Sequence, residues 1–257
     1  MDAVEILPPP VEAVNAAGTS PIVLICEHAS RFIPRRYAGL GLAESHLQRH
    51  IAWDIGAAAV ARCLSQRLDA ALVLAGYSRL LIDLNRPIAS ATSIPVISES
   101  TPIPGNENLT DAERTQRAAE FFTPFQSRIA QLLDRRLADR RRSIIVAIHS
   151  FTPVYKGVSR PWHAGILFRR STAFGRALAE ALGGAAAMIA ENQPYQIEDD
   201  GDYTIPVHGE ARGLDAVLVE LRQDLVAAGS GAIAWANRLA TALERVLLQD
   251  DLGINPA

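Results

Sequence analysis

Short apolar segments alternate with helical segments along this sequence, and this alternation constrains its fold more than any other feature. Apolar runs that predict buried strands lie at 21–26, 70–75, 143–148, 164–168, 186–190 and 217–221. Helical spacing of apolar residues predicts helices at 54–67, 110–141, 172–182 and 233–248. The pattern predicts an α/β fold, a three-layer sandwich in which helices flank a mixed, mostly parallel sheet.

The chain has 257 residues, a length that an α/β fold commonly forms as a single domain. We assign residues 20–257 to that domain and residues 1–19 to an N-terminal extension. Residues 87–108 are rich in Ser, Thr, Pro and Gly and show no periodicity. They predict a long surface loop, and long loops in compact domains are often functional.

Composition and charge exclude several classes of protein. The net charge is -3 and positive residues are scattered except for a group of arginines at 135–142, whereas nucleic-acid binding needs a basic face. Charges interrupt every apolar stretch before it could span a bilayer, and two cysteines are too few for a disulfide framework. The N-terminus does not resemble a secretory signal. We expect a cytoplasmic protein, monomeric or a small homo-oligomer, without nucleic-acid or membrane partners.

Chemically versatile side chains lie at the ends of three predicted strands. His28 and His149 each follow an apolar run, and Glu220 lies near the end of another. Ligand sites in such sheets lie outside the carboxyl ends of the strands. For His28 and His149, a pair of hydrogen-bonded histidines at strand ends is an equally good explanation as a ligand site. A carboxylate within an apolar strand, however, is costly to bury unless it is paired, for example with Arg222, or bound to something else.

The segment 77–86 places two arginines, an aspartate and an asparagine around a short apolar stretch. Arg79 and Arg86 carry forked guanidinium groups suited to carboxylates, and Asn85 offers directional hydrogen bonds. The alternative is a surface salt-bridge cluster. Asp54, just before a predicted helix, is either an ordinary N-cap or an oxygen ligand for a metal.

Two further residues have competing interpretations. His208 lies in a Gly-flanked loop, 206–213, which either closes over a ligand or forms a solvent-facing turn. Cys26 precedes Glu27 and His28, but a strand would hold its backbone about 6.6 Å from that of His28. A buried, inert cysteine is therefore favoured over a nucleophile.

The sequence resembles the N-formylglutamate amidohydrolase family from about residue 20 to 226. The matching stretches, in the same order as in the family, are Cys26-Glu27-His28-Ala29-Ser30 with Ile33-Pro34, and 50–56, 77–87, 149–151, 162–167 and 208–225. The resemblance implies a fold similar to the zinc carboxypeptidases and aspartoacylase-type deacylases, with one zinc, or another divalent ion, at the strand ends.

By this resemblance, His28 and His149 are metal ligands, Asn85 and Arg86 bind the substrate carboxylate, and Glu220 is the general base. The deacylases carry an acidic ligand three positions after the first histidine, where this chain has Arg31. Asp54 is our choice for the third ligand over Glu27, whose side chain should point away from that of His28.

The implied reaction is hydrolysis of a small N-acyl acidic amino acid such as N-formylglutamate, giving formate and the amino acid. Zinc would activate water, and Arg79 would stabilise the oxyanion. Arg222 and His208 would join the substrate contacts. The alternatives are a deacylase for another small acyl amide, such as N-formylmaleamate, and a non-catalytic anion-binding protein on the same scaffold.

Overall fold

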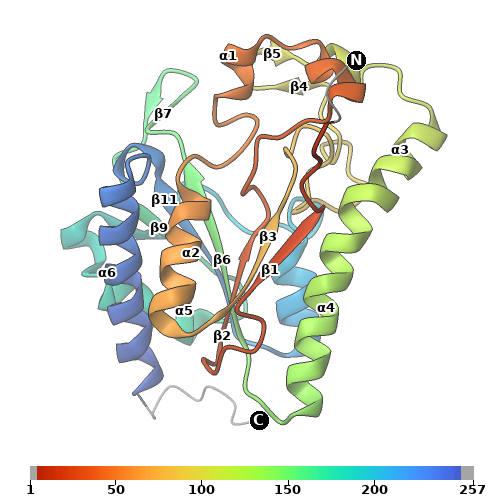
Figure 1. Cartoon of the computed structure of the whole chain (residues 1–257). Coiled ribbons are helices and arrows are strands. Elements are labelled where there is room, and N and C mark those ends of the chain that lie inside the picture. Colours follow the sequence, from red (N-terminus) through yellow and green to blue (C-terminus); the bar gives the residue numbers. More distant parts are fainter. Residues whose placement is uncertain (1–4, 250–257) are drawn as a thin grey trace.

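The computed structural model describes residues 5–249. Its centre is a seven-stranded sheet with helices on both faces (Figure 1). In spatial order the strands are β1 (Val11–Val14), β3 (Ala71–Ala75), β2 (Ile22–Cys26), β6 (Ile144–Phe151), β11 (Ala216–Arg222), β9 (Ala164–Leu167) and β10 (Ile189–Glu191).

The four central strands, β3, β2, β6 and β11, run parallel to one another. β1 is antiparallel to β3, β9 is antiparallel to β11, and β10 is parallel to β9. The predicted fold class, a mixed and mostly parallel sheet between helical layers, is confirmed. Residues 11–14, which we placed in an N-terminal extension, form an edge strand of this sheet. Residues 1–4 and 250–257 of the assigned segments lie outside the described residues.

One helical layer consists of α2 (Ala57–Leu68), α5 (Thr172–Ala181) and α6 (Gly229–Leu247), and α4 (Thr123–Ala138) covers the opposite face (Figure 1). The predicted long helix over 110–141 is divided. α3 (Asp111–Arg117) leads through a π-helical turn, 118–122, into α4, which has Pro124 in its first turn. Proline is tolerated there because the first helical N–H groups have no intrahelical partner.

The smaller elements lie outside the sheet. α1 (Glu44–Leu47) is a single turn, and two hairpins pair β4 (Ile97–Ser98) with β5 (Thr101–Pro102) and β7 (Val154–Tyr155) with β8 (Val158–Ser159). The loop predicted over 87–108 therefore contains a hairpin. The short strand predicted at 186–190 begins later, because 184–187 form a 3-10 turn.

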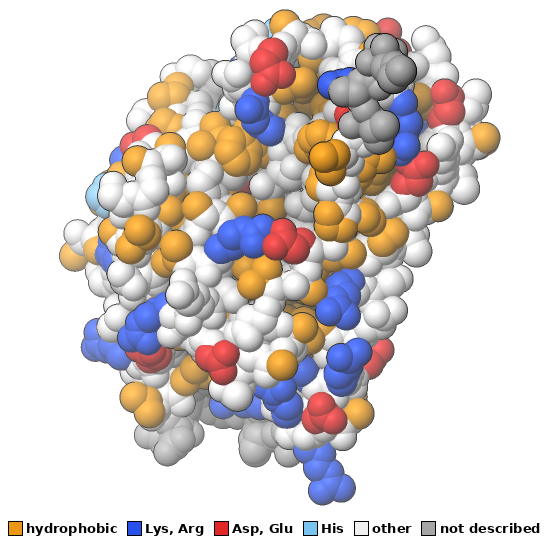
Figure 2. Space-filling model, in the orientation of Figure 1, with side chains coloured by type: hydrophobic (Ala, Val, Ile, Leu, Met, Phe, Trp, Pro, Cys, Tyr) orange, Lys and Arg blue, Asp and Glu red, His pale blue; other side chains and the backbone are white. Residues whose placement is uncertain are grey.

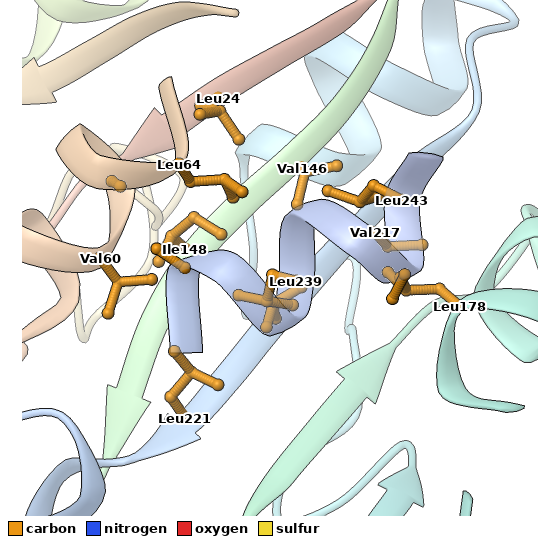
Figure 3. Packing of buried hydrophobic residues seen from close by; sticks show 14 of the residues in the cluster. Leu24, Val60, Leu64, Val146, Ile148, Leu178, Val217, Leu221, Leu239 and Leu243 are labelled. Atoms are coloured by element: carbon orange, nitrogen blue, oxygen red, sulfur yellow. The ribbon is translucent and has the colours of Figure 1, made fainter. Parts of the chain in front are cut away.

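Alternation along the strands divides the core into two parts. Leu24, Val146 and Val217 face the layer of α2 and α6, where Figure 3 shows them near Leu64 and Leu243. Their neighbours along the strands pack on the α4 side. Both sides are buried, which explains why these strands read as continuous apolar runs.

The same alternation positions the polar ends of the central strands. Ile148 and Val219 belong to the α2–α6 side of the core, so His149 and Glu220 project from the opposite face. The register of β6 and β11 places these two residues directly opposite each other. The fold thus gathers the sequence-predicted polar groups at one edge. Within residues 5–249, no helix combines the length and apolarity that membrane crossing requires.

Candidate metal centre and cavity

Three side chains converge where β2 and β6 end. His28 Nδ1 lies 3.3 Å and His149 Nδ1 2.8 Å from the same oxygen, Asp54 Oδ2. The three residues can each offer one ligand atom within 4.8 Å of the others. All three are buried, with at most 3% of their surface exposed. The structure therefore brings together the two histidines and the aspartate that we expected to bind a metal.

Local backbone contacts fix Asp54 in this place. Its backbone N–H donates to the carbonyl of His28 at 2.9 Å, and Ser150 N–H donates to its carboxylate at 3.3 Å. The N-cap of α2 is Gly56, so the N-cap interpretation of Asp54 is wrong. Gly56 has a φ of 85°, and a Cβ there would lie 2.4 Å from the carbonyl oxygen of Val226, which explains the glycine.

Each histidine contacts a second carboxylate through its other ring nitrogen. His28 Nε2 lies 2.7 Å from Asp83 Oδ1, and His149 Nε2 lies 3.0 Å from Glu27 Oε2. Such outer partners fix the tautomer and orientation of metal-binding histidines. Both Nδ1 atoms are thereby left facing Asp54. We had predicted no such role for Asp83 or Glu27 from the sequence, although the alternation that turns Glu27 away from His28 directs it towards the neighbouring β6.

The pKa values report a strongly negative environment. Burial alone would lower the pKa of His149, but the charge of Glu27 and the contact with Asp54 outweigh it and raise the pKa well above its usual value. The pKa of His28 is also raised, since Asp83 and Asp54 outweigh burial and Arg79. Burial would raise the pKa of Asp54, yet His28 and His149 lower it.

This charge distribution fits a cation. Glu27, Asp54, Asp83 and Glu220 are all at least 94% buried, and Arg79 is the arginine that pairs with two of them. Buried charges are costly unless they are compensated. Two imidazole nitrogens and a carboxylate oxygen are the donor set of a three-ligand zinc site.

Glu220 lies beside this cluster, directly opposite His149 in the register of β6 and β11. Its side chain is 6% exposed, and Oε2 has no hydrogen-bond partner within residues 5–249. Burial raises the pKa of Glu220 to about 7, with His149 acting in the opposite direction. A carboxyl group with a pKa near neutrality is suited to accept and return a proton. The structure does not pair Glu220 with Arg222, the alternative that the sequence left open.

A cavity of about 650 Å³ opens above the cluster. Its floor is formed by His28, Asp54, His149 and Glu220, and Arg79 also lines it. Arg79 donates to Asp83 Oδ2 at 2.6 Å and lies 3.5 Å from Asp54 Oδ1. The segment 77–86 is thus part of the site rather than a surface salt-bridge cluster. Thr92, Pro95 and residues 97–99 of the predicted loop also line the cavity.

Of the four residues that we expected to contact the substrate, two line the cavity and two do not. Arg86 lines the cavity and has no ion pair within residues 5–249. Asn85 also lines it, but its amide is engaged: Nδ2 donates to Asp202 at 2.9 Å, and Oδ1 accepts from the backbone of Tyr203 and Thr204. Asn85 therefore fixes the 202–204 segment.

Arg222 and His208 do not line the cavity. Arg222 donates to Asp224 at 2.8 Å and to the carbonyl of Pro161 at 3.0 Å. The loop we expected around His208 is a π-helical turn, 204–209, in which the imidazole is 4% exposed and contacts Gln126 at 2.8 Å. Neither residue enters our proposal for the site.

Three further residues complete the description of the site. Cys26 is fully buried, and burial raises the pKa of its thiol well above the usual value, in agreement with an inert cysteine. Tyr155 and Tyr195 line the cavity, and neither was predicted from the sequence. Their segments carry no strand-end signal, since Tyr155 lies on the β7–β8 hairpin and Tyr195 follows β10.

The face of the molecule in Figure 2 shows Lys and Arg side chains interspersed with Asp and Glu and with apolar groups. Among the described residues that this view shows, the basic side chains are scattered rather than gathered in one patch.

Comparison with known proteins gives a consistent result. The family model described as N-formylglutamate amidohydrolase matches residues 20–227. A solved gene product of Agrobacterium tumefaciens is 40% identical, with a TM-score of 0.90, over 93% of this chain and 95% of that one. N-formylglutamate amidohydrolase from Ralstonia eutropha has the same fold, with a TM-score of 0.69 and 17% identity over 93% of this chain and 97% of that one. No curated protein matches the chain.

Proposed function

We infer the reaction from the premise that this chain belongs to the N-formylglutamate amidohydrolase family, whose model covers residues 20–227. We propose that it is a metal-dependent amidohydrolase that cleaves the acyl–nitrogen bond of a small N-acyl acidic amino acid, with N-formylglutamate as the leading substrate. The observation that carries the proposal is the convergence of His28, Asp54 and His149 beside Glu220, whose Oε2 has no hydrogen-bond partner among the described residues.

His28 Nδ1, Asp54 Oδ2 and His149 Nδ1 would hold the ion, with zinc the best match to this donor set. When bound, the ion would supply Lewis-acid activation of water and of the acyl carbonyl. Asp83 and Glu27 keep the two imidazole rings oriented for this task.

Glu220 would move the proton. The water oxygen bonds to the acyl carbon as Glu220 takes the water proton, and the C–N bond breaks as Glu220 returns that proton to the leaving nitrogen. Hydrolysis of the formyl compound therefore yields formate and the free amino acid. The burial that raises the pKa of Glu220 to about 7 makes both transfers accessible near neutral pH.

Arginines would orient and stabilise the substrate. Arg86 lines the cavity without an ion pair among the described residues, so its guanidinium is free for the α-carboxylate. Arg79 lines the cavity beside Asp54 and would stabilise negative charge developing on the acyl oxygen. Asn85 would act indirectly, through the 202–204 segment.

A substrate screen tests the proposal. The zinc-loaded protein is assayed with N-formyl, N-acetyl and N-succinyl amino acids and with N-formylmaleamate, and bound metal is quantified in the same preparation. We expect stoichiometric zinc and release of formate from N-formylglutamate. A preference for N-formylmaleamate would support the alternative of a deacylase for another small acyl amide. Absence of both stoichiometric zinc and zinc-stimulated or cobalt-stimulated hydrolysis would support the non-catalytic binding protein instead.

A further inference from the structure

Arg160 is a buried arginine without a carboxylate partner among residues 5–249. It is 9% exposed, and the structure gives it no Asp or Glu oxygen within 4.0 Å in that range. Its guanidinium lies 4.4 Å from the ring centroid of Tyr155 and 4.8 Å from that of Tyr195. Nη1 donates to the Tyr195 hydroxyl at 2.8 Å. Aromatic contacts offset part of the desolvation cost of a buried cation, but they leave its charge uncompensated.

Both tyrosines that contact Arg160 line the cavity. Tyr195 reaches it because the 192–195 segment lies directly on β9. A Cβ at Gly165 would lie 1.6 Å from the carbonyl oxygen of Gln193, so this approach requires glycine. Asn192 fastens the same segment, donating through its N–H to Ile166 and accepting from Phe168 N–H. Tyr195 is therefore held in the wall, with Arg160 behind it.

The hydrogen bond between the two side chains assigns a direction to the Tyr195 hydroxyl. Because Arg160 has no acceptor atom on its side chain, the Tyr195 oxygen must accept this bond. Its own proton is then free for an acceptor in the cavity. A hydroxyl that accepts from a cation is a stronger donor than an isolated one, since neighbouring hydrogen bonds polarise each other.

The distribution of cations around the cavity indicates what that acceptor is. Arg79 is engaged by Asp83 and Asp54. Arg86 provides one guanidinium for one carboxylate. An N-acyl dicarboxylic amino acid carries a second carboxylate, and Arg160 with Tyr195 provides the remaining positive charge and donor at the wall.

We propose that Tyr195, backed by the charge of Arg160, binds the side-chain carboxylate of the substrate and so determines its preference for acidic amino acids. This inference rests on the proposed function and deepens it, because it assigns the specificity to residues outside the metal centre.

The test compares a charged and a neutral substrate of the same shape, N-formylglutamate and N-formylglutamine. Tyr195→Phe removes one oxygen from a side chain that is 41% exposed, so the fold should be retained. We expect kcat/KM for N-formylglutamate to fall about ten- to one-hundredfold, mainly through KM, the size of a lost charge-assisted hydrogen bond. The value for N-formylglutamine should change less than about threefold. Arg160→Met should reproduce this loss of preference, and Arg160→Lys should restore part of it.

Lys156→Met is the matched control. Lys156 lies on the same hairpin, 5.4 Å from the ring centroid of Tyr155, and is exposed, but it does not contact Tyr195. Removing its charge should leave the preference between the two substrates unchanged. Equal losses for both substrates in Tyr195→Phe would overturn the proposal, because they would place the hydroxyl at the reacting amide. An unchanged preference would overturn it as well.

Equilibrium binding separates this inference from the proposed function. The wild type should bind N-formylglutamate more tightly than N-formylglutamine whether or not it hydrolyses them, and Tyr195→Phe should abolish the difference. Preferential binding without formate release would sink the proposed reaction and keep the subsite. Hydrolysis without any preference for the charged substrate would do the reverse.

Discussion

The floor of the cavity, formed by His28, Asp54, His149 and Glu220, differs in construction from its wall, which includes Arg86, Tyr155 and Tyr195. On the floor, His28, Asp54 and His149 are buried and contact one another, and both imidazoles also contact outer carboxylates. On the wall, Arg86 lacks an ion pair within the described residues. The floor comes from the ends of central strands and their connections, whereas the wall comes from loops and hairpins.

This difference separates chemistry from recognition. Groups that must act at fixed positions are locked by a rigid sheet and by outer partners, which favours preorganised catalysis. Groups that recognise the substrate keep free donors that only a ligand satisfies. Substitutions on the floor should therefore impair metal binding or turnover, and substitutions on the wall should change substrate affinity.

The largest expected effect is on the floor. Glu220→Gln should keep the metal and lower kcat about a thousandfold, because the amide cannot accept a proton. His149→Ala should instead lose zinc, because it removes one of three ligands. Metal content and kcat measured on the same samples distinguish the two. Substantial turnover by the first variant or zinc retention by the second would contradict the roles we assign.

A subtler change on the floor tests the outer partners. Asp83→Asn and Glu27→Gln keep side-chain size but remove the carboxylate behind each histidine, which should weaken zinc affinity about ten- to one-hundredfold. The effect should be larger for Glu27, because Asp83 is already neutralised in part by Arg79 at 2.6 Å. Competition with a zinc chelator measures both affinities. Equal affinity in wild type and both variants would show that the rings need no such support.

On the wall, the expected change is in KM. Arg86→Leu should raise KM for N-formylglutamate about tenfold or more, with a smaller change in kcat, because it removes the anchor of the α-carboxylate, whose charge does not change during the reaction. Arg222→Leu is the matched control, since this arginine pairs with Asp224 outside the cavity. Steady-state kinetics at a fixed zinc concentration give KM and kcat for both variants. A KM increase in Arg222→Leu equal to that in Arg86→Leu would contradict the division between them.

The sequence predicted the floor better than the wall, for a physical reason. His28, His149 and Glu220 end or follow continuous apolar runs, and the parallel arrangement of the strands forces such ends together. Asp54 was our choice for the third ligand over Glu27, and the structure brings it to both imidazoles. We also expected alternation to turn Glu27 away from His28. We did not predict the contact with His149 that results.

Only part of the wall was predicted from the sequence, because the wall depends on how loops pack: Arg86 and the loop over 87–108 were expected at the site, whereas Tyr195 was not. Nothing local in the sequence shows that Tyr195 lies in the cavity. Its place follows from the close approach of Gln193 to Gly165 on another segment. His208 and Arg222 belong to stretches that resemble the family, but a buried turn and a local ion pair take them away from the cavity.

His208 gives the prediction with the smallest effect on activity, because it supports the wall from behind. It contacts Gln126, which donates to the carbonyl of Leu84 next to the Asn85–Arg86 pair. Burial lowers the pKa of His208 from 6.5 to about 4. Between these two pH values the unfolded chain binds the proton and the folded chain does not. The contribution of this group to the free energy of unfolding is therefore fully present above pH 6.5 and is lost as the pH drops towards 4, by about 3 kcal/mol.

His208→Gln should flatten this part of the pH dependence in urea unfolding while leaving kcat at pH 8 nearly unchanged. A wild-type profile that does not decline over this range, or a variant with the same decline, would show that the imidazole is not held neutral behind the wall.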